Sequence, residues 1–352
     1  MSKILLLPGD GIGSEIVEQG VKVMNAACGS LQIRTEEALI GGAAIDAVGS
    51  PFPEETRRKA LEADAVLLGA VGGPKWDHLP MDRRAEMGIL GIRKALELYA
   101  NIRPLDLWAP LAEFCPLKES YMKGVSLIIV RELTGDVYFG TPRGSSGSKG
   151  NREAFNTMHY HETEIIRVAH KAFQLAHLRR KKLCSVDKAN VLEAMGLWRQ
   201  VVGEVHADYP DVELTHMYVD NASMQLIRRA ADFDVILTPN LFGDILSDEA
   251  AVLSGSLGLQ PSASLGEKNA LYEPIHGSAP DIAGKNIANP IGTILSVAMM
   301  FELSLNAPDP AKKIRDAVRR TLEAGYRTAD IWTSGTTKVG TEEFGSLVVK
   351  NI

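Results

Sequence analysis

The chain has 352 residues and a formal net charge of −6, with 45% hydrophobic and 23% charged residues. This composition is typical of a folded protein with a sizeable core, arranged as two domains or one large one. The acidic balance does not support a nucleic-acid partner, and no apolar run is long enough to suggest a membrane span.

The cysteines and the N-terminal residues indicate where the protein works. Cys28, Cys115 and Cys184 lie far apart and lack metal-ligand spacing, which argues against a disulfide framework. Pro8 and Gly9 interrupt the first apolar run, so the N-terminus lacks the organisation of a signal peptide. We therefore expect a cytoplasmic protein.

Short apolar strands followed by glycines or charged residues recur along the chain. The first strand is predicted at 3–7, and a glycine turn leads from it into a helix at 14–27. These glycines match a dinucleotide-binding fingerprint poorly, so we predict only a tight turn near a ligand. Further strands are predicted at 65–68, 125–130, 183–186, 217–219 and 235–237. The pattern predicts an α/β fold with a largely parallel sheet and ligands at the carboxyl ends of its strands.

Three segments depart from this pattern. Residues 138–157 are turn-rich and polar, which predicts either a protruding arm that serves subunit association or a mobile surface loop. Residues 255–270 are predicted to be a loop. The basic cluster Arg179–Lys182 follows a predicted helix, and we interpret it as favourable charge at a helix C-terminus. His159 and His161 have no third ligand nearby and are predicted to be structural.

Two aspartates follow the strand at 235–237. A helix starting at Asp244 would place Asp244 and Asp248 on one face, one turn apart, while Glu249 would point elsewhere. Helix capping and a solvated surface position are the structural alternative. Asp220 follows another strand, and no His or Cys cluster accompanies the three acids. An all-oxygen site of this kind suits Mg²⁺ or Mn²⁺ and not Zn²⁺.

Arginine, lysine and tyrosine side chains accompany these acids near the ends of the predicted strands. Arg93, Arg103 and Arg131 lie in otherwise apolar surroundings, and three arginines suggest a substrate with more than one carboxylate. For each arginine alone, a structural salt bridge is an equal alternative. Lys188 and Tyr138 are candidates for a base and a proton donor.

The stretches that carry these residues are PGDGIGSE, GGAAID, GGPKWDHLP, GIRKALELYANIRP, VRELTGDVYFG, SVDKANVL, MYVDNASMQL, NLFGDILSDEAA and HGSAPDIAGKNIANP. In this order they resemble the isocitrate/isopropylmalate dehydrogenase family of metal-dependent β-decarboxylating dehydrogenases. The resemblance implies that family's own α/β fold, in which two α/β domains share a large mixed, largely parallel sheet, and not a Rossmann domain. Residues 1–99 and 255–352 would form the cofactor-binding domain. Residues 100–254 would form an inserted dimerisation domain that carries the arm.

The resemblance also implies roles for individual residues. Asp220, Asp244 and Asp248 would bind Mg²⁺ or Mn²⁺, with Asp220 and Lys188 supplied by the other subunit of a homodimer. Lys188 would help to take the substrate's hydroxyl proton, and Tyr138 would protonate the product. The implied substrate-binding residues are Arg93, Arg103, Arg131, Asp220, Glu86, Ile89, Leu90 and Val191.

The cofactor implied by the resemblance is NAD. Its implied contacts are Gly73, Glu86, Asn190, His276, Gly277, Ser278, Ala279, Asp281, Ile282 and Asn289. The carboxylate of Asp281 can accept a hydrogen bond from a ribose hydroxyl but repels a 2′-phosphate, which favours NAD over NADP. The structural alternative for Asp281 is a helix N-cap before Ile282.

The apolar residues around the implied side-chain pocket suit an isopropyl group, which indicates 3-isopropylmalate and a place in leucine biosynthesis. Gly91 stands where relatives often carry a larger residue. Homoisocitrate, isocitrate and tartrate or malate are the alternative substrates within the same chemistry. A regulatory subunit without catalytic activity is the alternative of a different class, and it predicts gaps among the metal and proton-transfer residues, all of which are present.

Overall fold

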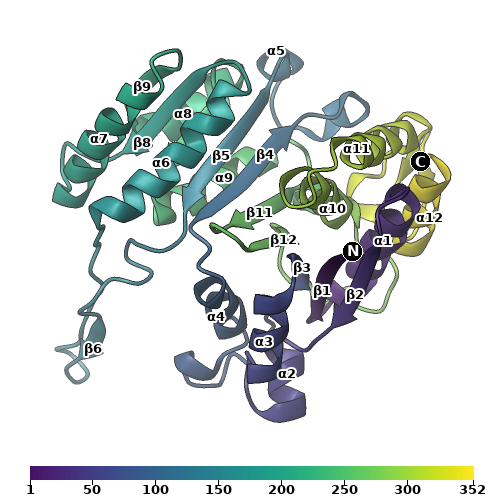
Figure 1. The fold of residues 1–352 in the computed structure, drawn as a ribbon, viewed down its shortest axis with the longest axis horizontal. Helices are drawn as coiled ribbons and strands as arrows, with labels where there is room; N and C mark the ends of the chain where they lie inside the picture. Colours follow the sequence, from purple (N-terminus) through teal and green to yellow (C-terminus); the bar gives the residue numbers. More distant parts are fainter. The chain divides into compact units, whose positions relative to one another are not determined.

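The structure is a computed structural model that describes all 352 residues, and they group into two compact units. Unit 1 comprises Met1–Leu98, Trp108–Pro116 and Ser254–Ile352, and unit 2 comprises Tyr99–Leu107 and Leu117–Leu253. Figure 1 labels the elements of both. No helix combines the length and apolar character that crossing a membrane requires.

Unit 1 contains five neighbouring strands in the order β2-β1-β3-β12-β11. Their bounds are β1 Ser2–Gly9, β2 Ile33–Glu37, β3 Ala65–Ala70, β11 Pro261–Leu265 and β12 Ala270–Pro274. All neighbours pair in parallel except β11 and β12, which are antiparallel. The predicted loop at 255–270 is therefore wrong in part, because β11 occupies five of its residues as a buried strand.

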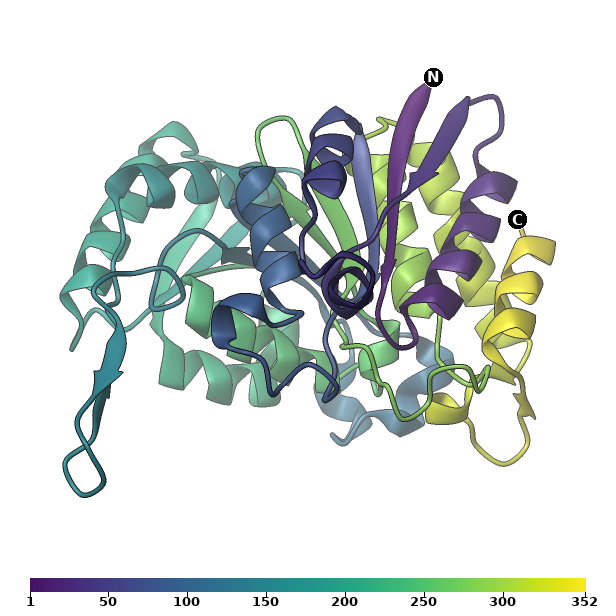
Figure 2. The ribbon, with the colours of Figure 1, turned by 90° about the horizontal axis from the view of Figure 1, so that it is seen from below.

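The helices of unit 1 come from both ends of the chain. They are α1 Gly13–Ala27, α2 Gly41–Val48, α3 Glu54–Glu62, α4 Met87–Ala95, α10 Ile291–Leu303, α11 Pro308–Glu323 and α12 Thr341–Lys350. The N-terminal helix α1 packs against the C-terminal helix α12, as Figure 2 shows in purple and yellow. The shorter elements are β13 Tyr326–Arg327, β14 Thr337–Lys338 and the 3₁₀ turns Met81–Arg83, Ala109–Phe114, Leu257–Leu259 and Ala329–Ile331.

Unit 2 contains five strands in the order β4-β5-β10-β8-β9. Their bounds are β4 Ala100–Asp106, β5 Ser126–Glu132, β8 Lys182–Asp187, β9 Glu213–Tyr218 and β10 Val235–Thr238. Strand β4 runs antiparallel to β5, and the other neighbours are parallel. The predicted α/β pattern is confirmed in both units.

The helices of unit 2 are α5 Glu119–Met122, α6 Glu162–His177, α7 Glu193–Val205, α8 Val219–Arg229 and α9 Asn240–Val252, with 3₁₀ turns at His206–Asp208 and Ala230–Asp232. Two predicted boundaries are wrong. Helix α9 begins at Asn240 and not at Asp244, because Pro239 sets an extended backbone just before it. The strand predicted at 217–219 is β9, which ends at Tyr218, so that Val219 and Asp220 already lie in the first turn of α8.

The two faces of β10 pack against different helices, because the side chains of successive strand residues point to opposite sides. Val235 and Leu237 belong to a core that includes Phe173 of α6 and Trp198 of α7. Thr238 points the other way, toward α9, where a Cβ added at Gly243 would lie 2.1 Å from its hydroxyl oxygen. Gly243 therefore allows the first turn of α9 to lie directly on the strand.

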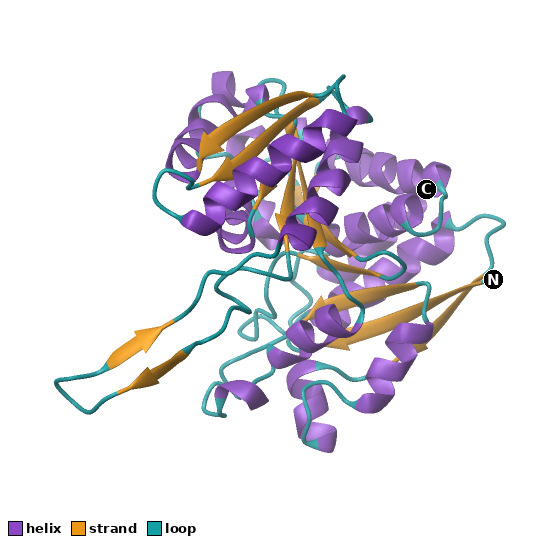
Figure 3. Ribbon diagram, turned by 60° about the vertical axis from the view of Figure 1, so that its left-hand side comes forward, coloured by secondary structure: helices purple, strands orange, loops and turns teal.

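The predicted arm contains a hairpin. Strands β6 (Gly144–Ser146) and β7 (Glu153–Phe155) pair in antiparallel fashion, and Figure 3 shows them as a two-stranded ribbon at the end of an extended segment. The structural role predicted for His161 is confirmed, since its side chain takes part in a capping box at the start of α6.

The basic cluster after α6 neutralises one buried acid. Asp234 is fully buried, and its carboxylate accepts hydrogen bonds from the guanidinium of Arg179 at 2.8 Å and from the backbone N–H of Arg180. The backbone N–H of Lys182 donates to the same carboxylate, so three of the cluster's four residues stabilise the start of β10, which is a more specific role than general favourable charge at a helix end.

Glu132 at the end of β5 is a second buried acid. Its carboxylate accepts hydrogen bonds from the backbone N–H groups of Thr134 and Gly135 at 2.6 and 2.8 Å. Burial raises the pKa of Glu132, although these hydrogen bonds oppose the rise. The folded state thus binds this proton more tightly than the unfolded chain does.

We expect a Glu132→Gln variant to show the pH dependence that follows. With the pKa of Glu132 raised on folding, its contribution to the free energy of unfolding is greatest at low pH and declines as the pH rises through the folded-state pKa. The free energy of unfolding of the wild type minus that of Glu132→Gln should be larger near pH 5 than near pH 8. Chemical denaturation at the two pH values measures this difference, and the exposed Glu267→Gln serves as the control. A difference independent of pH would contradict the expectation.

Candidate active site

Asp244 on α9 is the centre of a cluster of predicted site residues in unit 2. Its Oδ1 accepts a short hydrogen bond from Nη1 of Arg131, and its Oδ2 accepts one from the Tyr138 hydroxyl at 2.7 Å. Nη2 of Arg103 lies 3.5 Å from Oδ1. Asp248, one turn along α9, accepts a hydrogen bond from Nη1 of Arg103 at 3.1 Å. The structure thus brings five predicted residues together.

The two arginines of this cluster come from neighbouring strands and are held by amide oxygens. Arg131 on β5 donates from Nε and Nη2 to Oδ1 of buried Asn240 at 3.0 and 2.8 Å. Arg103 on β4 donates from Nε to Oδ1 of Asn101 at 2.8 Å. Each guanidinium is therefore oriented from behind while its remaining N–H groups face the carboxylates.

Burial and charge shape the acid–base properties of the cluster. Burial raises the pKa of Tyr138, and the negative charge of Asp244 raises it further. Burial also raises the pKa of Asp248, while the guanidinium of Arg103 opposes the rise and the carboxylate of Asp244 adds to it. The two carboxylates on one helix face are thus balanced by two arginines, and their oxygen donors are of the type that Mg²⁺ and Mn²⁺ prefer.

Lys188 and Asp220 form a separate pair in unit 2. Nζ of Lys188, just after β8, donates to Oδ1 of Asp220 at 2.9 Å, and this bond lowers the pKa of Asp220. The Asp220 side chain is 62% exposed. Asn190 and Val191 lie exposed on the same loop as Lys188, with Val191 69% exposed. Four predicted residues therefore gather at the surface of the chain.

The three predicted metal ligands do not gather within one chain. No group of three or more His, Cys, Asp or Glu side chains is placed to hold a metal ion. In this chain Asp244 and Asp248 pair with arginines, and Asp220 pairs with Lys188.

In unit 1, helix α4 carries four predicted substrate residues at helical spacing. Glu86 precedes the helix, and Ile89, Leu90 and Arg93 follow at intervals that place them on one side. Nη2 of Arg93 donates to Oε1 of Glu273 at 2.8 Å, whereas its shielded Nε has no hydrogen-bond partner.

The other side of α4 packs through glycines. A Cβ added at Gly88 would lie 2.7 Å from the carbonyl oxygen of Pro51, and one added at Gly91 would lie 2.9 Å from the ring of Phe52. Real Cβ atoms do not tolerate such distances without movement of a neighbour. Gly91 thus serves close packing of the helix on the segment behind it.

The two predicted cofactor segments of unit 1 meet at Ser278. Its hydroxyl donates to the carbonyl oxygen of Gly72 at 2.7 Å, next to Gly73. Its carbonyl oxygen accepts from the backbone N–H of Ile12 at 2.8 Å, in the glycine turn after β1. The turn predicted to lie near a ligand is therefore in direct contact with the predicted cofactor segment.

The residues after β12 leave room for a ligand. Nδ1 of the His276 ring is 2.9 Å from the carbonyl oxygen of Gly277, and its shielded Nε2 has no partner. Burial lowers the pKa of His276, which favours the neutral ring. Ala279 adopts a left-handed φ of 38°, and a Cβ at Gly277 would meet nothing within 4 Å. The unpartnered His276 nitrogen is enclosed by protein, and the open space lies at Gly277, where a ligand has room beside the backbone.

The remaining cofactor candidates differ in exposure. Asp281 is exposed and lies in a turn with Ile282, so the alternative that it caps a helix is wrong. Asn289 is buried, where its Nδ2 donates to Asp330 at 2.9 Å and its Oδ1 accepts from the backbone N–H of Ile291.

Sequence reasoning missed several supporting residues, namely Asp10, Asn101, Asn240, Ser247 and Glu273. Asn240 and Asp10 both lie in stretches that carry the resemblance, but an amide after proline and an acid between glycines also fit turns. The Asp10 carboxylate accepts three backbone N–H groups, from Gly42, Ala43 and Gly72, at 2.7–2.8 Å. Burial raises the pKa of Asp10.

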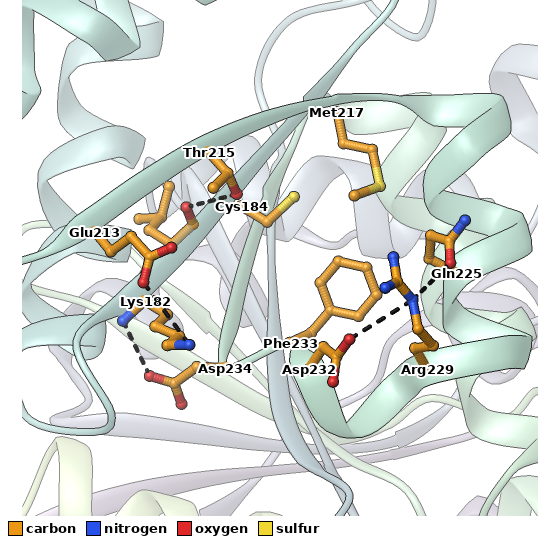
Figure 4. A pocket seen from close by; sticks show the side chains of 11 residues that line it. Lys182, Cys184, Glu213, Thr215, Met217, Gln225, Arg229, Asp232, Phe233 and Asp234 are labelled. Carbon is orange, nitrogen blue, oxygen red and sulfur yellow. Dashed lines mark hydrogen bonds and ion pairs between the residues drawn. The ribbon is translucent and has the colours of Figure 1, made fainter. Parts of the chain in front are cut away.

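A cavity of about 290 Å³ lies elsewhere in unit 2, between β8, β9 and α8. Figure 4 shows Cys184, Met217 and Phe233 among its lining side chains, with the Lys182–Glu213 and Arg229–Asp232 ion pairs also drawn. None of the predicted site residues lines it. It is therefore separate from the candidate active site.

Comparison with known proteins shows similarity along almost the whole chain. The family model described as isocitrate/isopropylmalate dehydrogenase matches residues 3–348. A 3-isopropylmalate dehydrogenase from Nitratidesulfovibrio vulgaris is 59% identical, with 99% of each chain covered. One from Aquifex aeolicus is 56% identical, with 99% of this chain and 97% of the relative covered. A solved isocitrate dehydrogenase from Methylococcus capsulatus has a TM-score of 0.88 at 34% identity, covering 100% of this chain and 99% of the other.

Proposed function

The chain belongs to the isocitrate/isopropylmalate dehydrogenase family, and we propose that it oxidises and decarboxylates 3-isopropylmalate to 2-oxoisocaproate with reduction of NAD, in leucine biosynthesis. Family membership confirms the resemblance and the fold class predicted from the sequence. The observation that carries the proposal is the cluster of Arg103, Arg131 and Tyr138 around the Asp244–Asp248 pair.

The choice of substrate rests on two observations. The relatives that share more than half of the sequence bear the name 3-isopropylmalate dehydrogenase, whereas the isocitrate dehydrogenase shares 34%. In addition, Ile89 and Leu90 give the substrate side of α4 an apolar character. A third carboxylate, as in isocitrate, would need polar partners at this place.

The arginines supply recognition of the two substrate carboxylates. Arg103 and Arg131 are oriented by Asn101 and Asn240, so their remaining N–H groups are fixed in direction before substrate binds. Arg93 lies on the same side of α4 as Ile89 and Leu90, and we assign it a further contact with one of these two carboxylates. Glu86, Ile89 and Leu90 on α4 and Val191 of the other subunit complete the substrate contacts.

Asp244 and Asp248 of one chain and Asp220 of the other would hold the divalent metal, Mg²⁺ or Mn²⁺. When bound, this ion supplies positive charge that acidifies the substrate hydroxyl and stabilises negative charge during decarboxylation. The fit is supported by the oxygen-only donor set and by the arrangement of the first two acids on one helix face.

Two side chains move protons. Lys188 of the other subunit would accept the proton of the substrate hydroxyl, and NAD, when bound, would supply the acceptor for the hydride from the carbon that carries this hydroxyl. After loss of CO₂, Tyr138 donates its hydroxyl proton to the carbon that lost the carboxylate. The raised pKa of Tyr138 accords with a phenol that holds its proton until that step.

A homodimer with shared active sites completes this arrangement. Helix α8 exposes Met224 and Ile227, which are 54% and 37% exposed, and α9 exposes Ile245 and Val252, at 59% and 50%. Adjacent apolar positions on two helices that pack together are typical of an association surface. The hairpin β6–β7 offers further backbone for pairing with a second copy.

NAD would lie in unit 1 along the two segments that meet at Ser278. The open space at Gly277 supports the adenosine end here. Gly73 and Glu86 would approach the nicotinamide end, together with Asn190 of the other subunit. Ala279, Asp281, Ile282 and Asn289 complete the proposed cofactor contacts. Three free cysteines accord with a reducing compartment, and we propose the cytoplasm.

The experiment that tests the proposed function follows NADH formation with 3-isopropylmalate, homoisocitrate, isocitrate, malate and tartrate. We expect the highest kcat/KM with 3-isopropylmalate in the presence of Mn²⁺, and loss of turnover with EDTA. Absence of turnover with 3-isopropylmalate, or turnover that EDTA leaves unchanged, would overthrow the proposal. Turnover of none of the five substrates would favour a regulatory subunit.

Cofactor choice is tested at Asp281. We expect Asp281→Lys to lower the ratio of kcat/KM with NAD to kcat/KM with NADP by about tenfold or more, since about 1.4 kcal/mol of differential binding is tenfold. The physical reason is that the carboxylate repels a 2′-phosphate, whereas an ammonium attracts it. Asp309→Lys, at another exposed acid of unit 1, is the control. An unchanged ratio in Asp281→Lys would refute the assignment.

A further inference from the structure

Next to Lys188 in the chain lies an ion pair with a buried carboxylate. Asp187 at the end of β8 is fully buried, and its carboxylate accepts hydrogen bonds from Nε and Nη2 of Arg199 at 2.8 and 2.9 Å. The same carboxylate accepts the backbone N–H of Ala189 at 2.9 Å. The Asp187 carboxylate therefore fixes the backbone at Asp187 and at Ala189, on the two sides of Lys188.

The Arg199 guanidinium also contacts Tyr218, which lies close to Asp220 in the sequence. Its central carbon lies 4.9 Å from the centre of the Tyr218 ring, a cation–π contact. Tyr218 pairs with Asp187 in the β8–β9 register and precedes α8, whose first turn carries Asp220. Arg199 thus contacts the residue before Lys188 and a residue two positions before Asp220.

We propose that Arg199 is a positioning residue that holds Lys188 and Asp220 together as one unit for the active site of the other subunit. This inference rests on the proposed function, in which both side chains act in that site. Arg199 comes from the middle of α7, a helix packed on the sheet through Trp198, so its anchor is rigid. The two side chains that must enter another chain's site would otherwise depend on one exposed loop and one helix end.

The guanidinium is required for this role because it has two directions of contact. Its planar fork matches the carboxylate of Asp187, and its face stacks on Tyr218. Lysine at this position would keep the charge but lose both the paired hydrogen bonds and the stacking. Arg199→Lys therefore separates the charge from the geometry, and Tyr218→Leu removes the stacking while leaving the ion pair.

We expect Arg199→Lys, Arg199→Ala and Tyr218→Leu to lower kcat with 3-isopropylmalate and to weaken Mn²⁺ binding in the presence of substrate, measured by titration without NAD. Groups that orient ligands from behind typically change metal affinity or activity by about 10- to 100-fold. The matched control is Arg179→Ala, because Arg179 also binds a fully buried aspartate, Asp234, at the start of β10. We expect this control to lower the temperature of unfolding comparably while kcat and Mn²⁺ affinity stay unchanged.

Mixed dimers show which chain's site Arg199 serves. A Tyr138→Phe chain carries an intact Lys188–Asp220 pair, and an Arg199→Ala chain carries an intact Tyr138. A dimer of one of each should regain about half of wild-type activity, since one of its two sites then has only intact residues. If Arg199 instead supported the site of its own chain, neither site would be intact and the mixed dimers would stay as inactive as their parents. That result would overturn the inference.

A Lys188→Ala chain mixed with the Tyr138→Phe chain is the reference for shared sites. If this reference pair regains no activity, the active sites are not shared between subunits. The role of Arg199 is then tested by comparing kcat of the double variant Lys188→Ala with Arg199→Lys against kcat of Lys188→Ala alone. An unchanged kcat in the double variant supports action of Arg199 through Lys188. A further fall in kcat by the whole factor that Arg199→Lys causes in the wild type contradicts it. Equal loss of kcat in Arg179→Ala and Arg199→Ala would also contradict positioning, because it would show a general effect of stability. Failure of the proposed function is distinct, since the wild type itself would then not turn over 3-isopropylmalate.

Discussion

Replacing Asp244 by Asn is expected to lower kcat by roughly 100- to 10,000-fold, because several kcal/mol of charge stabilisation depends on this carboxylate. Asp244 accepts hydrogen bonds from Arg131 and Tyr138 and lies within 3.5 Å of Arg103. Asparagine keeps the shape but removes the charge and one acceptor oxygen. It would weaken metal binding and leave the two guanidinium groups uncompensated.

Steady-state kinetics over a range of Mn²⁺ concentrations measures this effect, and direct Mn²⁺ titration shows whether affinity falls with it. Asp316→Asn is the matched control, because Asp316 has the same exposed fraction of 34% and also pairs with an arginine, but lies on the surface of unit 1. An Asp244→Asn enzyme with wild-type kcat and Mn²⁺ affinity would remove Asp244 from the proposed metal site.

Charged substitutions on α8 are expected to separate the subunits and abolish activity together. Met224→Asp with Ile227→Asp places two carboxylates on the surface that we propose to be buried between subunits. Isolated chains would retain Tyr138, Arg103 and Asp244 but would lack Lys188 and Asp220 from a second copy. We expect kcat to fall by at least about 100-fold, the range of losses when a general base is removed.

Analytical ultracentrifugation gives the oligomeric state, and circular dichroism shows whether the chains remain folded. Val48→Asp, at a 61% exposed apolar residue of unit 1, is the control that should leave both mass and activity unchanged. A folded, fully active monomer would refute the shared site.

The sequence predicted the alternation of strands and helices well, because apolar runs and glycine turns are local signals. Boundaries were less accurate where a side chain far along the chain decides them. Helix α9 starts at Asn240, directly after Pro239, and the Asn240 side chain is held there by Arg131 of β5, a contact that the local sequence does not reveal. Strand β11 escaped prediction because Ser262 and Ser264 make it look polar, yet both are buried.

The site was predictable in part for a similar reason. Asp244 and Asp248 share a helix, so their spacing in the sequence places them on one face. Their partners Arg103 and Arg131 come from the antiparallel strands β4 and β5, and these residues are brought to Asp244 and Asp248 only by the tertiary packing of α9 on the sheet. Asn240 could not be distinguished from a turn residue by its sequence context. Asp220 was recognised from its position after a strand, but its proposed role in the site of another subunit came only from the resemblance, because patterns within one chain do not indicate contributions between chains.

The glycine packing of α4 has a consequence for how substrate preference evolves. Ile89, Leu90 and Arg93 sit on one rigid helix whose opposite side rests on Pro51 and Phe52. A larger residue at position 91 would meet the Phe52 ring, so that either this ring or the helix must move. If the helix moves, Ile89, Leu90 and Arg93 move with it, and the proposed substrate pocket would change through a position that faces away from it.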